Sequence, residues 1–97
     1  MEIIELDLTG CTHQIDIQKR IKVAFDFPDW YGHNWDAFRD MLLNEVDADK
    51  VILKGIYSLP ASLDKPLAIM FKIFEENVQE HKKYSMYLKP FSYEIVS

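Results

Sequence analysis

Cysteine is nearly absent from this chain of 97 residues, because Cys11 is the only one. A single thiol cannot form a disulfide within the chain, and it cannot supply a metal centre that needs several thiolate ligands. The class of small domains held together by disulfides is therefore excluded. We expect Cys11 to be a small, partly buried residue that follows the first strand, and not a reactive nucleophile.

Long hydrophobic runs are also lacking. The apolar stretches are only a few residues long, too short to cross a bilayer. The opening MEIIELDL carries acids where a secretion signal carries bases. No low-complexity segment or flexible linker interrupts the chain, and its length fits one domain. We therefore expect a single domain over residues 1–97, located in the cytoplasm, with no membrane contact.

Positive charge is scarce in the first half of the chain. Residues 1–49 contain eleven acids and four bases, and between Asp26 and Asp49 the only base is Arg39. Residues 50–97 contain five acids and seven bases. A negative field repels phosphate backbones, so direct nucleic-acid binding is not expected. The charge favours a basic protein or a small cation as partner, although an acidic surface can also serve solubility alone.

Three segments have strand patterns. Residues 2–8 alternate and are rich in β-branched side chains, and residues 49–55 form a nearly continuous apolar run, typical of a central strand covered on both faces. Residues 84–88 are predicted to form the last core strand, and the tail 89–97 to be either an edge strand or a loop. Helices between the strands imply parallel pairing. The predicted fold is α/β, a three-stranded parallel sheet packed with helices.

Helical spacing of apolar residues predicts helices in the segments between the strands. A first helix over residues 16–27 is expected to end before Pro28, because the residue before proline avoids the helical region. A last helix is expected to open with Pro66 at its first position. The helix between them, over residues 35–44, has Asn34 as a favourable N-cap.

The helix over residues 35–44 has two different faces. Trp35, Phe38 and Leu42 follow the i, i+3, i+7 spacing, so they are expected to face the core. The opposite face is charged and carries Asp36, Arg39 and Asp40. This charged face can be explained by an active site, a metal site or a surface for another protein.

An active site is poorly supported by these residues. Asp36 and Asp40 lie one helical turn apart, but glycosidase chemistry needs a cleft between two carboxyls, one of them with a raised pKa. An exposed helix face provides no cleft. The sequence also contains no Ser/His/Asp set, no phosphate-binding glycine loop and no dinucleotide fingerprint.

A metal site would draw on side chains of the same region, namely Asp29, His33, Asp36 and Asp40. His33 and Asp36 have a usable i, i+3 spacing, but there is no His-x-x-x-His pair and no calcium-loop spacing. We expect His33 to be an exposed loop residue and expect no metal or other cofactor. His13 and His81 are predicted to be ordinary surface residues.

A protein-binding surface explains these residues better than an active site or a metal site does. Interface hot spots favour Trp, Tyr and Arg beside well-placed charges. Trp30 and Tyr31 are expected to be exposed in the loop before the helix, and Gly32 is free to take a positive φ that lets the loop approach a partner. Either aromatic residue can instead cover the edge of the core, and Asp36 can simply suit the positive end of the helix.

The segment FPDWYGHNWDAFRDML, from Phe27 to Leu42, resembles the signature of the barstar family, intracellular inhibitors of barnase-type ribonucleases. The family pattern is proline, acid, two aromatics, glycine, any residue, asparagine, hydrophobe, aspartate, alanine, hydrophobe, a variable residue and aspartate. This chain has that order from Pro28 to Asp40. The preceding DIQKRIKVAFDFP and the later FEE are also similar to the family.

The resemblance implies the same α/β fold and a non-enzymatic inhibitor that forms a 1:1 complex with a basic ribonuclease. It implies that Asp40 takes the place of the scissile phosphate, that Asp36 pairs with a second basic group, and that Trp30 packs on the catalytic histidine. Glu76 would meet another base. The implied partner-binding residues are Trp30, Tyr31, Gly32, Asn34, Asp36, Arg39, Asp40 and Glu76.

Three features depart from the type member of that family, and one of them is the lone Cys11. Arg39 stands where the type member has a tryptophan, and the tail from Lys89 onward differs. A ribonuclease toxin other than barnase is therefore an equally suitable target, with this chain as its immunity protein. The alternative is a non-inhibitory interaction module of the same fold that binds another basic protein.

Overall fold

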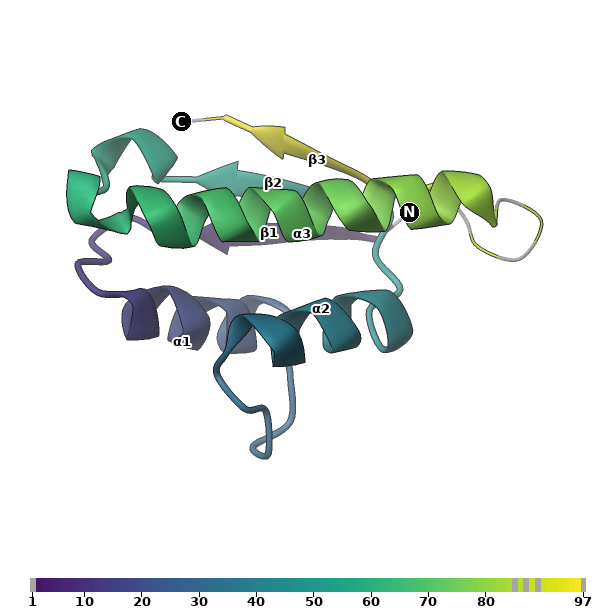
Figure 1. The fold of residues 1–97 in the computed structure, drawn as a ribbon, viewed down its shortest axis with the longest axis horizontal. Coiled ribbons are helices and arrows are strands. Elements are labelled where there is room, and N and C mark those ends of the chain that lie inside the picture. Colours follow the sequence, from purple (N-terminus) through teal and green to yellow (C-terminus); the bar gives the residue numbers. More distant parts are fainter. Residues whose placement is uncertain (1, 85, 87, 89, 97) are drawn as a thin grey trace.

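The computed structural model describes residues 2–84, 86, 88 and 90–96 (Figure 1). Its strands form one parallel sheet in the order β1-β2-β3, made of β1 (Ile3–Asp7), β2 (Lys50–Lys54) and β3 (Ser92–Ile95). The helices of the described residues are α1 (Gln14–Ala24), α2 (Trp35–Asn44) and α3 (Asp64–Lys83). Two 3₁₀ turns, η1 (Ile56–Ser58) and η2 (Ala61–Leu63), connect β2 to α3. The predicted α/β fold is confirmed.

One face of the sheet is buried beneath the helices. Leu6 of β1 and Leu53 of β2 are partners in the register and are fully buried. In β3, the strand that pairs with the other edge of β2, the ring of Tyr93 lies 5.4 Å from the ring of Phe74 in α3. Figure 1 shows α3 running across the sheet, with α1 and α2 on the β1 side. This layered arrangement provides the core on which α2 rests.

The other face of the sheet carries charges. Ion pairs join neighbouring strands, with 2.9 Å between Lys50 and Glu94 and 3.2 Å between Lys54 and Glu5. Ile52 is only half-buried between them. The prediction that β2 is covered on both faces is therefore wrong, because partly exposed ion pairs lie over this face in the described part of the chain.

The third strand lies in the tail, and the described positions 84, 86 and 88 of the predicted strand are not in a strand. Helix α3 continues to Lys83, Tyr84 forms its C-cap, and the described Met86 is 89% exposed. The predicted strand partly falls outside the described residues, because positions 85 and 87 are among those not described. The chain must return to the start of β2 before it can pair in parallel. The edge-strand alternative for the tail is the correct one.

Both predicted proline boundaries are shifted. Helix α1 ends at Ala24, before Pro28, because Asp26 takes a left-handed conformation with φ 55°. The backbone N–H of Phe27 then donates to the carbonyl of Lys22 at 3.0 Å and closes the helix end. Helix α3 begins before Pro66, which occupies its third position. Proline is tolerated there because the first N–H groups of a helix have no partner inside the helix.

The core is rich in aromatic rings. The rings of Phe38 in α2 and Phe74 in α3 meet at 5.5 Å, and both side chains are fully buried. Cys11 is also buried, as predicted, and burial raises the pKa of its thiol. The prediction for His81 is wrong, because this residue is buried on α3 beside the ring of Phe91.

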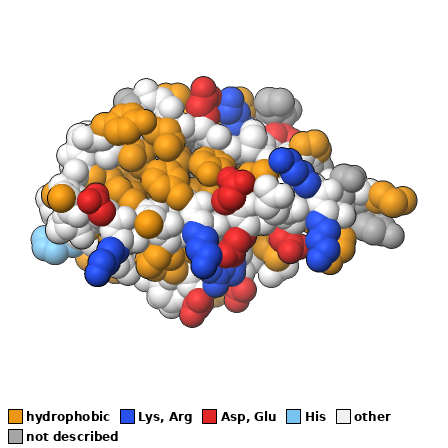
Figure 2. All heavy atoms as spheres, turned by 45° about the horizontal axis from the view of Figure 1, so that its top comes forward, with side chains coloured by type: hydrophobic (Ala, Val, Ile, Leu, Met, Phe, Trp, Pro, Cys, Tyr) orange, Lys and Arg blue, Asp and Glu red, His pale blue; other side chains and the backbone are white. Residues whose placement is uncertain are grey.

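The surface seen in Figure 2 is mixed. Hydrophobic side chains gather at the left of this view, while Lys or Arg side chains alternate with Asp or Glu side chains over its middle and lower parts. Tyr57 in η1 is among the exposed large hydrophobic residues of the protein. No helix in the described part of the chain combines the length and apolar composition needed to cross a membrane.

The start of α1 makes stability depend on pH. The backbone N–H groups of Thr12 and His13 donate to the Asp16 carboxylate at 3.1 and 3.0 Å, and these bonds lower the pKa of Asp16 below its usual value of 3.8. The lowered pKa means that this contribution is present above pH 3.8 and is lost as the pH falls through the folded value. We expect Asp16→Asn to be less stable than wild type at pH 7, with a difference that shrinks in acid. Urea unfolding between pH 7 and pH 2 measures it, and a difference independent of pH contradicts it.

Candidate protein-binding site

The loop between α1 and α2 presents one aromatic side chain and buries the next. Trp30 is 74% exposed, whereas Tyr31 is 2% exposed. The Tyr31 ring packs 4.9 Å from that of Phe27, and its hydroxyl donates to Gln18 Oε1 at 2.5 Å. Burial raises the pKa of the Tyr31 phenol. The predicted exposure of Trp30 is confirmed, while Tyr31 takes the alternative place at the edge of the core and supports the loop from within.

Removing the Tyr31 hydroxyl tests this support. In Tyr31→Phe the buried Gln18 amide oxygen loses its donor, so we expect the free energy of unfolding to fall by about 1–3 kcal/mol. The double variant Tyr31→Phe/Gln18→Leu removes both polar groups and should recover much of the loss. Urea unfolding of the four proteins of this cycle gives the coupling. Equal stability of Tyr31→Phe and wild type would contradict the assignment.

The turn into α2 is built around Asn34. Its side-chain oxygen accepts from the N–H of Ala37 at 2.8 Å, which confirms the predicted N-cap, and its amide nitrogen donates to the carbonyl of Gly32 at 3.1 Å. A Cβ on Gly32 would lie 3.0 Å from that nitrogen. The positive φ predicted for Gly32 is wrong, because the left-handed residue is His33, with φ 52°. A larger residue at position 32 would crowd the Asn34 amide, which caps the helix.

Helix α2 has the two faces that its sequence predicts. Phe38 and Leu42 are buried, and Trp35 is half-buried with its ring 6.0 Å from that of Phe38. On the other face the Asp36 side chain is 96% exposed, and Asp40 is exposed one turn later. The rise of an α-helix separates these two carboxylates by about 6 Å along the axis. The buried face thus holds the acidic face toward solvent.

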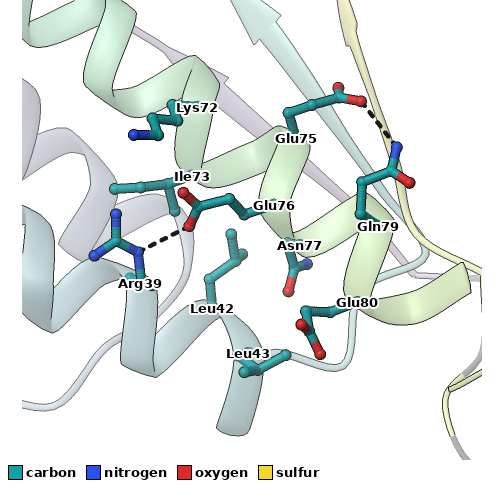
Figure 3. Close-up of a pocket in the computed structure, with 10 residues that line it drawn as sticks. All are labelled: Arg39, Leu42, Leu43, Lys72, Ile73, Glu75, Glu76, Asn77, Gln79 and Glu80. Carbon is teal, nitrogen blue, oxygen red and sulfur yellow. Dashed lines mark hydrogen bonds and ion pairs between the residues drawn. The ribbon is translucent and has the colours of Figure 1, made fainter. Parts of the chain in front are cut away.

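Arg39 is paired within the protein. Its Nε lies 3.0 Å from Oε2 of Glu76 on α3 (Figure 3). Its Nη1 lies 3.7 Å from Oδ1 of Asp36. Arg39 therefore does not stand as a bare positive charge on an acidic surface. The same pair brings Glu76 next to α2. Asp40 differs from both acids, because its carboxylate has no ion-pair or hydrogen-bond partner within the described residues.

The possible metal ligands do not form a site. Among the described residues no group of three His, Cys, Asp or Glu side chains is arranged to hold a metal ion. Asp29 is paired with Lys22 at 3.2 Å, and His33 lies beside Tyr31, with 5.2 Å between the ring centroids. The surface thus offers carboxylates for contact with a cationic partner.

The sequence reasoning missed a groove between α2 and α3. Figure 3 shows it between the side chains of the two helices, and its volume is about 530 Å³. Leu42 and Leu43 contribute to one wall, and Asn77 and Glu80 to the other. Leu43 follows Asp36 and Asp40 at i+7 and i+3, and this spacing is the one signal that places it on the same stripe of α2.

These observations define a small α/β protein with an acidic helix face, an exposed tryptophan in the adjoining loop and a third carboxylate from a neighbouring helix. The family Barstar (barnase inhibitor) matches residues 1–94, and the chain belongs to this family. Barstar family members are inhibitors and not enzymes, and the family implies that the chain binds a ribonuclease. Neither the curated proteins nor the solved structures compared with the chain gave a match.

Proposed function

We propose that this protein inhibits a basic ribonuclease by covering its active site with Trp30 and the acidic face of α2. The observation that carries the proposal is the orientation of α2, which buries Phe38 and exposes the carboxylates of Asp36 and Asp40 to solvent. An active site that binds RNA must hold cationic side chains for the phosphates. Carboxylates can occupy the same positions.

Each exposed residue has a role in this proposal. Asp40, which has no partner in the described part of the chain, replaces the scissile phosphate and accepts charge-assisted hydrogen bonds from the bases of the ribonuclease. Asp36 meets a second base at the start of the helix. Trp30 offers an exposed flat ring to pack on the catalytic histidine. Tyr31 and Asn34 act indirectly, since both hold the loop that carries this ring.

Arg39 and Glu76 give the surface some adaptability. Their ion pair is partly exposed, and exposed pairs typically contribute only about 0–1 kcal/mol. A base of the ribonuclease can therefore replace Arg39 at Glu76 at low cost, while Arg39 turns toward an acid of the partner. This exchange favours a target whose surface differs from that of barnase at this point.

The proposal includes a setting for the protein. It acts as a single domain in the cytoplasm, in a 1:1 complex and without a cofactor, as the immunity protein of a ribonuclease toxin. The acidic half of the sequence, with eleven acids and four bases in residues 1–49, speeds the encounter with a basic enzyme. No chemistry on the RNA is required of the inhibitor.

Inhibition is tested by adding the protein to a panel of basic ribonucleases, barnase among them, and following cleavage of a fluorescent RNA. We expect at least one enzyme to be titrated at a 1:1 ratio, with an association rate that falls as salt is raised. An acidic protein of similar charge, added at the same concentration, controls for non-specific binding. If no ribonuclease of the panel is inhibited and the protein binds another basic protein instead, the interaction-module alternative is favoured.

A further inference from the structure

The groove between α2 and α3 has an apolar floor directly beside the acidic face. Leu42 and Leu43 of α2 and Ile73 of α3 contribute hydrophobic side chains to it. Leu43 is partly exposed and continues the stripe that begins with Asp36 and Asp40. A partner bound over that stripe would therefore reach the groove without any change in the fold.

A buried acceptor without a donor belongs to a residue that lines this groove. Asn77 is 5% exposed and lines it, and Figure 3 shows its side chain extending from α3 toward Leu43. Its Oδ1 has no hydrogen-bond partner among the described residues. Buried polar atoms are nearly always paired, and an unpaired one costs about 1–3 kcal/mol. The unpaired amide oxygen of Asn77 is explained if a donor from a bound partner reaches it.

The rim of the groove carries both charges, with Arg39 and Lys72 toward one end and the carboxylates of Glu75, Glu76 and Glu80 in excess over them. Glu80 lies one turn from Asn77 along α3, and its carboxylate has no partner within the described residues. Glu76 stands at the other end of the groove, held by Arg39. A ligand that enters between them therefore meets an apolar floor, a neutral acceptor and an unpaired carboxylate.

We propose that the α2–α3 groove is a pocket for an arginine side chain of the partner protein. The methylene stem of the arginine lies on Leu42 and Leu43, and its guanidinium donates to Asn77 Oδ1 and to the carboxylate of Glu80. This inference names one contact of the proposed complex and so rests on the proposed function. It adds a site on α3 that is separate from Trp30 and from the carboxylates of α2.

Arginine fits this pocket better than lysine does. Its guanidinium has five donors in a rigid plane, so it can serve Asn77 and Glu80 together. It is also more weakly hydrated than an ammonium group, which lowers the cost of entering a groove with an apolar floor. A lysine offers a compact charge that suits the carboxylate but leaves less reach for a second acceptor.

The pocket can be tested on the free protein by NMR. Isotope-labelled protein is titrated with N-acetyl-arginine methylamide, and with the corresponding citrulline compound as an uncharged control of the same shape. We expect saturable shifts of the Asn77 side-chain amide and of the Leu42 and Leu43 methyl groups, with binding about tenfold weaker for citrulline. Shifts confined to the Asp36 and Asp40 face, or equal shifts with citrulline, overturn the inference.

Two variants separate a binding role from a structural one. Asn77→Leu removes the unpaired acceptor at similar volume, so its unfolding midpoint should equal or exceed that of wild type while its arginine affinity falls about tenfold. Glu80→Gln, at a partly exposed position, should also weaken arginine binding without loss of stability. Unchanged arginine affinity in both variants overturns the pocket, as does a loss of stability in Asn77→Leu that leaves affinity intact.

A failure of the arginine pocket can be distinguished from a failure of the proposed function. If Asp40 proves essential for inhibition and the arginine compound does not bind the groove, the pocket is wrong and the inhibitor stands. If the compound binds as described and no ribonuclease is inhibited, the proposed function is wrong, and the groove serves a different arginine-bearing partner. In a working complex, Asn77→Leu should weaken inhibition by about the same factor as it weakens arginine binding.

Discussion

Asp40→Ala is expected to weaken inhibition of the target ribonuclease by about 2–5 kcal/mol, a range to which the barnase–barstar pair itself contributes. This corresponds to an inhibition constant about 30-fold to several thousand-fold higher. The reason is that the bases of the ribonuclease become buried without a carboxylate to accept their hydrogen bonds. Asp40 has no partner among the residues that the structure describes, so its removal breaks no contact with them.

A matched variant controls for the change in net charge. Glu94→Ala removes the same charge from the open face of the sheet, away from the side on which the helices pack. At physiological salt it should change inhibition by less than about 0.5 kcal/mol, because distant exposed charges are screened. Inhibition constants for the two variants and wild type decide the question. Equal inhibition by Asp40→Ala and wild type would remove the basis of phosphate mimicry.

Phe38→Ala is expected to lower the free energy of unfolding by about 3–5 kcal/mol, the usual cost of emptying an aromatic site in a core. The Phe38 side chain is fully buried between three rings, 5.7 Å from Phe25, 6.0 Å from Trp35 and 5.5 Å from Phe74. Because domains of this kind are stable by only about 5–15 kcal/mol, this variant should be close to unfolding. Urea unfolding measures the loss.

Two further variants keep this prediction testable. Val23→Ala truncates an exposed side chain of α1 and should change stability by no more than about 0.5 kcal/mol. Phe38→Leu leaves a smaller void and should lose less than Phe38→Ala, so it gives a value even if the alanine variant does not fold. A loss below 1 kcal/mol in Phe38→Ala would show that α2 is not anchored through this ring.

The segments that were predicted correctly are those governed by neighbours in the sequence. Asn34 caps α2, whose bounds are those expected, because the cap needs only the backbone three residues ahead. The division of α2 into a buried and a charged face follows from helical spacing alone. The exposed half of the candidate site, Asp36 and Asp40, was therefore visible in the sequence.

The predictions that failed depend on distant residues. Tyr31 was expected at the surface, but it is buried, and its hydroxyl donates a hydrogen bond to Gln18 on α1. His81 was expected outside, yet the return of the chain through Phe91 buries it. The third strand was placed too early because residues 84–88 are apolar, whereas the length of α3 moves the pairing into the tail. Local patterns contain no information on such long-range packing.

By itself the sequence determined the α/β pattern, the capped amphipathic helix and the resemblance to the barstar family. These depend on residue types at short spacings, where propensity, capping and periodicity act directly. Only the tertiary structure decided that Arg39 is paired with Glu76, and that Asn77 and Glu80 face the leucines of α2 across a groove. Those contacts join residues on two different helices, and they exist only once the shared core has set the helices side by side.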